Sequence, residues 1–416
     1  MKRIISVFMV LCLIVAMTPA AFATGEEPAW DGVTISSSLS TVDGVYQISN
    51  GADLAKFADM INKNQQTSSK FELTANINLG GHTFTPIGAN ATEASHSRYS
   101  FSGEFNGNGF MIYNAVIASA ENMGIFGYVK SGANIYNLDL DYITVSQPQA
   151  VGSEPAIGVL AGSVYKATIT DIFVGEHCVV NGVQRVGGVI GSVRDGCTID
   201  NCDSEAAVTC TGMYCGGIVG VAHDLDISFL GTLTGSPATI KNCDNSGTVS
   251  GNTEVGGIVG YTDQTTIQNC NNSGDVTATG NYGCGGIVGF DAYNPRSFVI
   301  INYEPDTGAT ITGCDNSGTI NGPRSGGIVG TLGVTPGQDQ PDEVKTLTKI
   351  IDCDNFGDIT GTSGKCGAIF GYQITYAHGD ASEYINHLYV NIQGCTFDCN
   401  VNNQAATVAT ESEYVN

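Results

Sequence analysis

The chain has 416 residues, and its 40 acidic residues outnumber 16 basic ones, which gives a formal net charge of −24. This charge argues against a nucleic-acid ligand and against anionic lipid, because binding to either depends on clustered lysine and arginine. Since 42% of the residues are hydrophobic and only 13% are charged, a disordered acidic tail is also excluded. The 55 glycines, with many Val, Ile and Thr, favour an all-β fold.

Residues 1–23 have the pattern of a secretory signal peptide. Lys2 and Arg3 precede the apolar run from Ile4 to Met17, and residues 21–23 read Ala-Phe-Ala, a cleavage sequence. We therefore expect export by the Sec pathway and a secreted or cell-surface protein. No other stretch is long and apolar enough for a membrane span. Residues 24–43 are expected to form a flexible lead.

Residues 44–100 are predicted to form an N-terminal cap that contains an amphipathic helix and the first strands. Apolar residues recur at helical spacing at Leu54, Phe57, Ala58 and Ile61. Asn50 stands at the N-cap position of this helix. We expect the helix to cover the open end of a solenoid, where bare strand edges would invite aggregation. Binding to a partner is the alternative role.

From residue 101 to 416, a phrase of the form Gly-Gly-Ile-Val-Gly recurs. Its copies begin at residues 123, 158, 187, 216, 256, 285, 326 and 367, so the shortest step is 29 residues. Each unit holds three short β-prone runs separated by turn residues, and only stacking of the units can bury a core. An antiparallel sandwich would not keep three runs in fixed order at a fixed period. We therefore predict a right-handed parallel β-helix, a solenoid of about nine rungs.

Stacking should place equivalent residues in columns. The residue three before each cysteine of the recurring phrase Asn-Cys or its variants is always isoleucine: Ile199, Ile240, Ile267, Ile311, Ile350 and Ile392. The sixth residue after each cysteine is always Val or Ile, as buried strands require. The cysteine column itself is predicted to contain Ala115, Leu138, Ile172, Cys202, Cys243, Cys270, Cys314, Cys353 and Cys395. Cysteine is thus expected to be a buried free thiol that acts as a small hydrophobe, with an occasional disulfide between neighbouring rungs left open.

Four units are longer than the others, and each is lengthened at the same corner of the coil. The resulting excursions are residues 221–239, 290–310, 331–349 and 372–391. Loops on one side of a rigid solenoid often carry function. Their aromatic residues are the predicted ligand-binding residues: Phe229, Tyr293, Phe298, Tyr303, Tyr372, Tyr376, Tyr384 and Tyr389. Tyrosine suits sugars and protein surfaces, although these rings could instead pack small cores within the loops.

The recurring phrases resemble the GLUG motif, a Gly-aliphatic-bulky-Gly repeat of secreted and surface proteins of bacteria. Its copies are GIFG at 124–127, GVIG at 188–191, GIVG at 217–220, 257–260, 286–289 and 327–330, and AIFG at 368–371. The resemblance covers roughly residues 100–400 and implies a β-helical surface module, in some members a stalk beside an IgA-cleaving metallopeptidase. It implies no catalytic residue, and none of the six histidines lies in an H-E-x-x-H pattern.

The leading hypothesis is a binding or adhesion module for an extracellular glycan or protein, with the excursions as its ligand face. The alternatives are a carbohydrate-active enzyme, either a polysaccharide lyase or a hydrolase, and a purely structural stalk. We assign no catalytic residue and expect no cofactor. Stacked aspartates offer one alternative, a Ca²⁺ site, at Asp203, Asp244, Asp315 and Asp354. The surrounding Cys-Asp-Asn-Ser-Gly sequence is also typical turn chemistry.

Overall fold

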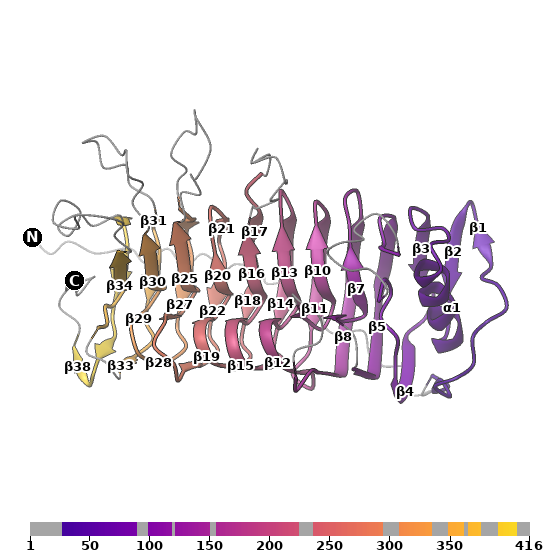
Figure 1. The fold of residues 1–416 in the computed structure, drawn as a ribbon, viewed down its shortest axis with the longest axis horizontal. Coiled ribbons are helices and arrows are strands. Elements are labelled where there is room, and N and C mark those ends of the chain that lie inside the picture. The colour runs from indigo at the N-terminus through magenta and orange to yellow at the C-terminus, as the bar shows by residue number, and fades with distance from the viewer. Residues whose placement is uncertain are drawn as a thin grey trace, which may run out of the picture.

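The protein was analysed as a computed structural model, which describes residues 27–89, 99–118, 121–149, 155–223, 236–293, 308–334, 348–361, 365–375 and 390–405. These residues form an elongated β-solenoid, and the chain advances along its long axis from the helix α1 (Gly51–Asn62) at one end (Figure 1). The prediction of an all-β parallel solenoid with a short capping helix is confirmed. The expected signal peptide lies outside the described residues.

One face of the solenoid is an eight-stranded parallel sheet in which strands from successive coils lie side by side. Its members are β7 (Phe126–Val129), β10 (Ala161–Tyr165), β13 (Ile190–Arg194), β16 (Val219–His223), β20 (Val259–Thr262), β25 (Val288–Tyr293), β30 (Val329–Val334) and β34 (Phe370–Thr375). These strands begin within the Gly-Ile-Val-Gly phrases, so each phrase turns the chain into this face.

A second parallel stack follows at the next corner, and it confirms the predicted isoleucine column. Its nine strands in the described chain are β5 (Glu104–Ile117), β8 (Asn134–Ser146), β11 (Thr168–Val174), β14 (Thr198–Ser204), β17 (Thr239–Lys241), β21 (Thr266–Gln268), β26 (Thr310–Thr312), β31 (Thr348–Ile351) and β35 (Val390–Gln393). Phe105 of β5 pairs with Ile135 of β8, so the column changes to aromatic residues toward the N-terminus.

The coil then passes through short strands to a third face. The short strands are β18 (Asp244–Asn245), β22 (Asn271–Asn272), β27 (Asp315–Asn316), β32 (Asp354–Asn355) and β36 (Thr396–Phe397). The third face holds β12 (Val179–Gly187), β15 (Ala207–Gly216), β19 (Val249–Gly256), β23 (Val276–Ala278), β28 (Ile320–Gly322), β33 (Ile359–Gly361) and β37 (Asn400–Val401). Its register aligns the predicted Val/Ile column.

The remaining strands are β1 (Thr41–Val42), β2 (Val45–Ile48), β3 (Lys70–Leu73), β4 (Ile77–Thr83), β6 (Asn122–Met123), β9 (Ala156–Ile157), β24 (Cys284–Gly285), β29 (Ser325–Gly326) and β38 (Gln404–Ala405). Strands β2 and β3 pair in parallel and extend the stack toward the helix. Within the described ranges, no helix is long and apolar enough to cross a membrane.

Helix α1 closes the N-terminal end of the core. The side chain of Asn50 accepts a hydrogen bond from the backbone N–H of Asp53, as expected of an N-cap. Phe57 is buried, with its ring centre 3.9 Å from that of Phe71 and 5.8 Å from that of Phe105. The helix therefore covers the aromatic end of the column inside the coil.

The described part of the expected flexible lead, residues 27–43, packs against this cap. The backbone N–H of Trp30 donates to the carbonyl of Asn78 at 2.9 Å, and that of Ser36 donates to Ala52 at 3.1 Å. Strand β1 pairs antiparallel with β2. In this respect the structure differs from the expectation, because the segment finds hydrogen-bond partners that the sequence pattern does not reveal.

The predicted burial of the cysteines is confirmed. Of the thirteen cysteines from Cys178 onward, all except Cys395 are buried. The backbone explains why asparagine precedes the cysteine in each Asn-Cys phrase. Asn201, Asn242 and Asn269 take left-handed φ angles of 53°, 53° and 51° at this corner. Asparagine tolerates this conformation better than most residues.

The predicted cysteine column is wrong at one member, Ala115. Leu138 pairs with Phe110, whereas Ala115 pairs with Ile143. The reason is a register shift between Asn106 and Phe110 in β5, which offsets the two strands.

A ladder of buried asparagines links successive coils and explains why two phrases recur together. Nδ2 of Asn245 donates to Oδ1 of Asn272, Asn272 donates to Asn316, and Asn316 donates to Asn355, each at 2.8 Å. The first glycine of each GIVG phrase packs against this ladder. A Cβ atom at Gly257 would lie 2.3 Å from Cγ of Asn272, so only glycine fits. The Asn-Ser-Gly and Gly-Gly-Ile-Val-Gly phrases are therefore two sides of one contact.

The four predicted excursions connect equivalent positions in their coils. Each leaves a strand of the eight-stranded sheet and returns to the adjacent strand of the second stack: β16 to β17, β25 to β26, β30 to β31, and β34 to β35. Their central parts, residues 224–235, 294–307, 335–347 and 376–389, lie outside the described residues.

Candidate binding groove

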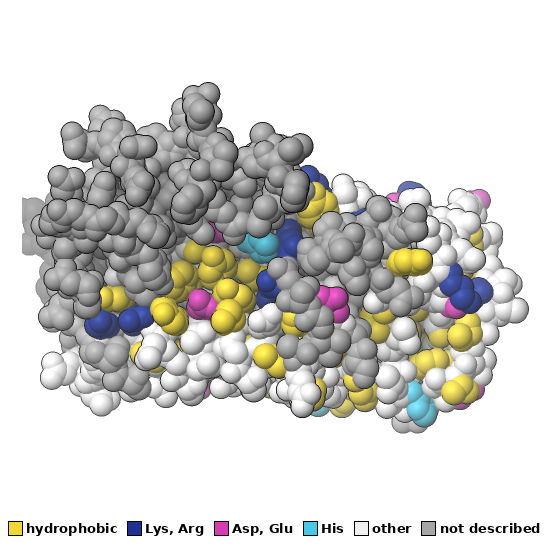
Figure 2. All heavy atoms as spheres, in the orientation of Figure 1, with side chains coloured by type: hydrophobic (Ala, Val, Ile, Leu, Met, Phe, Trp, Pro, Cys, Tyr) yellow, Lys and Arg dark blue, Asp and Glu magenta, His cyan; other side chains and the backbone are white. Residues whose placement is uncertain are grey.

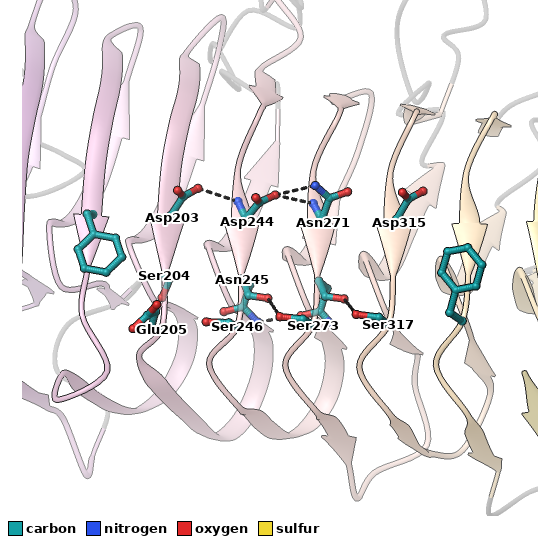
Figure 3. Close-up of a pocket in the computed structure, with 13 residues that line it drawn as sticks. Asp203, Ser204, Glu205, Asp244, Asn245, Ser246, Asn271, Ser273, Asp315 and Ser317 are labelled. Atoms are coloured by element: carbon teal, nitrogen blue, oxygen red, sulfur yellow. Dashed lines mark hydrogen bonds between the residues drawn. The ribbon is translucent and has the colours of Figure 1, made fainter. Parts of the chain in front are cut away.

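A shallow groove of about 460 Å³ runs along the short strands β18, β22 and β27 (Figure 3). Along these strands side chains alternate between the inside and the outside of the coil. The ladder asparagines point inward, and the residues on either side of them point outward. Because the coils are in register, the outward residues form two parallel rows that line the groove.

The first row, which we call the acidic row, consists of Asp203, Asp244, Asn271 and Asp315. The second, the serine row, consists of Glu205, Ser246, Ser273 and Ser317. Figure 3 shows the two rows on successive strands, with the acidic row at one edge of the groove and the serine row at the other. Both rows present oxygen atoms that can accept hydrogen bonds from a ligand.

Backbone hydrogen bonds hold the acidic row in place. Oδ1 of Asp203 accepts from the N–H of Asp244 at 2.9 Å, and Oδ1 of Asp244 accepts from both the backbone N–H and the side-chain Nδ2 of Asn271. Oδ1 of Asp315 accepts from the N–H of Asp354 in the same way. Among the described residues, the Oδ2 atoms of these three aspartates accept no hydrogen bond, so they remain available to a ligand.

The groove is electrostatically negative. Burial raises the pKa of Asp203 to about 6, and the neighbouring Asp244 carboxylate adds to the increase while its N–H opposes it. None of the described residues that line the groove is Lys or Arg. At neutral pH the groove therefore presents carboxylates without compensating basic side chains, which disfavours an anionic ligand.

An exposed phenylalanine stands near each end of the groove. Phe173 of β11 pairs with Asp203 and so precedes the acidic row, whereas Phe356 lies one coil beyond Ser317 and continues the serine row. Their side chains are 38% and 51% exposed. Five strand spacings of about 4.8 Å separate their coils, which places the rings roughly 24 Å apart along the solenoid. Both rings are therefore exposed on the polar side of the solenoid.

The four aspartates considered as Ca²⁺ ligands lie in a row along this groove and do not converge on one point. Asp203, Asp244 and Asp315 line it, and Asp354 continues the row one coil farther. They point outward in a line, each bonded to the next strand, rather than toward a common centre. Within the described part of the chain, no group of three or more His, Cys, Asp or Glu residues is placed to hold a metal ion.

The predicted ligand-binding aromatics are mostly outside the described residues. Phe229, Phe298, Tyr303, Tyr376, Tyr384 and Tyr389 fall there, and so does the side chain of Tyr293 at the end of β25, so for them the assignment stays a prediction. Tyr372 is described and is only 3% exposed. Its ring centre lies 5.2 Å from the guanidinium carbon of Arg324 and 4.5 Å from Nζ of Lys365, so these basic side chains cover it.

A further group of aromatic residues lies on the outer side of the eight-stranded sheet. Tyr261 and Phe290 stack with ring centres 5.9 Å apart, and Arg324 also approaches Tyr282. On the face that Figure 2 displays, hydrophobic side chains lie among Lys, Arg and acidic side chains. Phe290 is buried, whereas Tyr282 is 41% exposed, comparable to Phe173 of the groove.

Sequence reasoning missed Phe173 and Phe356. Both signals were present in the repeat alignment, because an aromatic residue at either position replaces the Asp or Ser that other coils carry there. The columns were predicted from the residues that the coils share, whereas the groove depends on two residues by which single coils differ.

Comparison with known proteins supports the motif seen in the sequence. The family model for the GLUG motif matches residues 251–277, which span the coil from β19 to β23. The chain carries the GLUG motif. Gly257 and the ladder residue Asn272 of this coil pack against each other, as described above.

Halomucin from Haloquadratum walsbyi is 28% identical over 217 residues, which cover 43% of this chain and 2% of halomucin. The chain thus corresponds to a small part of that relative's length. Among solved structures, a Bacteroides ovatus chain described as a proposed immunoglobulin A1 protease has a TM-score of 0.39 and 15% identity over 89% of this chain and 81% of that one. At that TM-score the likeness carries no argument, and the assignment of the fold rests on strand pairing.

Proposed function

We propose that this chain is an extracellular glycan-binding module and that the groove holds a sugar chain along the solenoid axis. The observation that carries the proposal is a groove lined by hydrogen-bond acceptors, with an exposed phenylalanine near each end. Sugars combine hydroxyl groups with apolar C–H faces, so they suit a site that offers both oxygen acceptors and aromatic rings. The signal-like residues 1–23 and the acidic composition support a location outside the cell.

The charge of the groove narrows the class of glycan. Carboxylates of Asp203, Glu205, Asp244 and Asp315 would repel uronic acids and sulfated sugars. The same oxygens accept hydrogen bonds from neutral hydroxyls and from ammonium groups. We therefore favour a neutral or amino-sugar polymer over an acidic one. The length of the groove, roughly 24 Å between the coils of the two rings, suits an extended chain rather than a single sugar.

The direct test is binding of purified protein to neutral, amino-sugar and acidic polysaccharides by affinity electrophoresis and calorimetry. Phe173→Ala and Phe356→Ala should each weaken binding about tenfold, which corresponds to about 1.4 kcal/mol. Tyr142→Ala is the matched control, because Tyr142 is 50% exposed and does not line the groove. If both phenylalanine variants bind every glycan as the parent protein does, the groove is not the glycan site. If only protein ligands bind, the proposed class of ligand is wrong.

A carbohydrate-active enzyme is less well supported by the same geometry. Glycoside hydrolysis requires two carboxyl groups on opposite sides of the scissile bond. The described groove aspartates lie in one row, each tied to the next strand, and the opposite row holds a single carboxyl group, that of Glu205, beside three serines. Release of reducing ends from a bound polysaccharide, lost in Asp203→Asn, would overturn the binding-only proposal in favour of catalysis.

The excursions are proposed as a second contact surface for the same ligand. Their support is the aromatic content of the sequence and the shared corner from which they leave the solenoid. Phe298→Ala together with Tyr303→Ala should weaken binding if the excursions contribute. Unchanged affinity in that variant, with reduced affinity in Phe356→Ala, would assign recognition to the groove alone.

A further inference from the structure

Two positions on the third face of the solenoid oppose each other within each coil. The first position is occupied by Gly182, Cys210, Gly251, Ala278, Gly322 and Gly361 in successive coils. The second is occupied by Val186, Cys215, Val255, Cys284, Ser325 and Cys366. The first position therefore carries Gly or Ala in every coil except one, where it carries cysteine.

The reason for the small residues is steric. A Cβ atom at Gly182 would lie 2.8 Å from Cγ2 of Val186, and one at Gly251 would lie 2.8 Å from Cγ2 of Val255. At Gly361 the added Cβ would lie only 1.7 Å from Sγ of Cys366. At these three positions a side chain would be directed at the second position of its own coil, whereas at Gly322 it would meet Ala278 and Cys284 of the preceding coil.

Cys210 is the exception, and the local backbone accommodates it. Strand β15 has a register shift between Cys210 and Met213, and Tyr214 takes a left-handed φ of 69° at the corner. A bulge of this kind adds room on one strand. Both side chains are almost completely buried, and Sγ of Cys210 donates to the carbonyl of Val183 at 3.0 Å. Two thiols therefore face each other where every other described coil has at most one.

We propose that Cys210 and Cys215 form a disulfide within their coil when the protein folds in an oxidising compartment. The oxidant is a disulfide, either of a thiol oxidoreductase or of a low-molecular-weight thiol. One S–S bond forms between Cys210 and Cys215 while the S–S bond of the oxidant breaks, and the two protons and two electrons of the thiols pass to the oxidant. The bridge closes the bulge in β15.

In the cysteine column at the other corner, the thiols lie on successive coils rather than within one coil. Sγ of Cys314 accepts a hydrogen bond from the N–H of Cys270, and Sγ of Cys353 accepts one from Cys314, each at 3.4 Å. Leu138 and Ile172 occupy this column in earlier coils. These slots hold a small hydrophobe of any kind, so we expect their thiols to stay reduced.

The test is differential alkylation of the full chain after secretion into an oxidising compartment. Free thiols are blocked in denaturant with one reagent, disulfides are reduced, and the released thiols take a second reagent of different mass before peptide mapping. We expect the second label at Cys210 and Cys215 and the first label at the other cysteines. In Cys215→Ala, Cys210 should take the first label, whereas Cys243→Ala, a column control, should leave the pair oxidised.

The proposal is overturned if Cys210 and Cys215 carry the first label in the parent protein, or if Cys210 carries the second label in Cys215→Ala because it pairs elsewhere. If Cys215→Ala does not fold, Cys210→Gly provides the same test through Cys215. Glycine is the residue that most coils have at this position, so that variant should fold.

Discussion

Replacement of Asn272 by alanine should destabilise the solenoid far more than replacement of its sequence neighbour Asn271. Asn272 is buried in the middle of the asparagine ladder. Its Nδ2 donates to the carbonyl of Gly274 and to Oδ1 of Asn316, and its Oδ1 accepts from Asn245, all at 2.8 Å. Alanine removes all three bonds without bringing water to the groups that lose them.

The expected magnitude follows from those orphaned groups. The carbonyl of Gly274 and Oδ1 of Asn316 would each lose this partner in a buried site, at a cost of about 1–3 kcal/mol apiece. Nδ2 of Asn245 keeps its bond to Gly247, so its loss is smaller. With the small cavity that alanine leaves, we expect Asn272→Ala to lower the free energy of unfolding by about 3–5 kcal/mol.

Urea unfolding followed by far-ultraviolet circular dichroism measures this difference. Asn271→Ala is the matched control, because Asn271 is exposed and its Nδ2 bond to Asp244 is open to water. We expect that variant to lie within about 0.5 kcal/mol of the parent protein. Equal shifts of the urea midpoint for the two variants would refute the conclusion that the ladder, rather than the short strands in general, holds these coils together.

Three further predictions test other parts of the structure. Ser204→Asn should raise the free energy of unfolding in urea by about 1 kcal/mol, because it extends the ladder to Oδ1 of Asn245, which is buried without a partner in the described structure; an unchanged or lower value would contradict this. Burial raises the pKa of Asp203 to about 6 from its ordinary 3.8, so the folded protein binds this proton more tightly than the unfolded chain, and the stability it contributes is present below pH 4 and lost as pH rises through 6. Asp203→Asn should therefore raise the free energy of unfolding at pH 7.5 by about 1 kcal/mol, after allowance for partial exposure, and leave it unchanged at pH 4; an equal gain at both pH values would point to another cause. Phe57→Ala should lower the free energy of unfolding by about 3–5 kcal/mol and promote aggregation, which light scattering detects. Lys63→Ala, at the exposed end of the helix, should do neither.

The repeating part of the fold could be predicted because its physical requirements recur in every coil. An inward strand position requires a β-branched apolar residue, so Ile and Val recur in register along the sequence. The corner before the cysteine requires a left-handed residue, so Asn, Asp or Gly appears there. Each requirement concerns a single position in the coil, and its recurrence in every coil makes it recognisable in the sequence.

Features that depend on a pair of residues far apart in the sequence could not be predicted from it. The register shift in β5 displaced Ala115 from its predicted column, because a bulge changes pairing without changing composition. The fit of Gly257 against Asn272 joins residues of one coil through its interior, and sequence spacing shows only that both recur. The packing of residues 27–43 against the cap rests on backbone hydrogen bonds that any side chains could allow.

The asparagine ladder also changes where function should be sought in a chain of this kind. If the GLUG glycine and the ladder asparagine form one contact, the motif serves the stacking of coils and contributes no side chain to a ligand. Residues that follow the column pattern are then accounted for by the fold, and those that depart from it need another cause. Phe173 and Phe356 depart by placing exposed rings in polar rows, and Cys210 departs by placing a second thiol where glycine suffices. The first pair leads to the glycan groove and the last to the disulfide, so both proposals rest on the same rule applied to different columns.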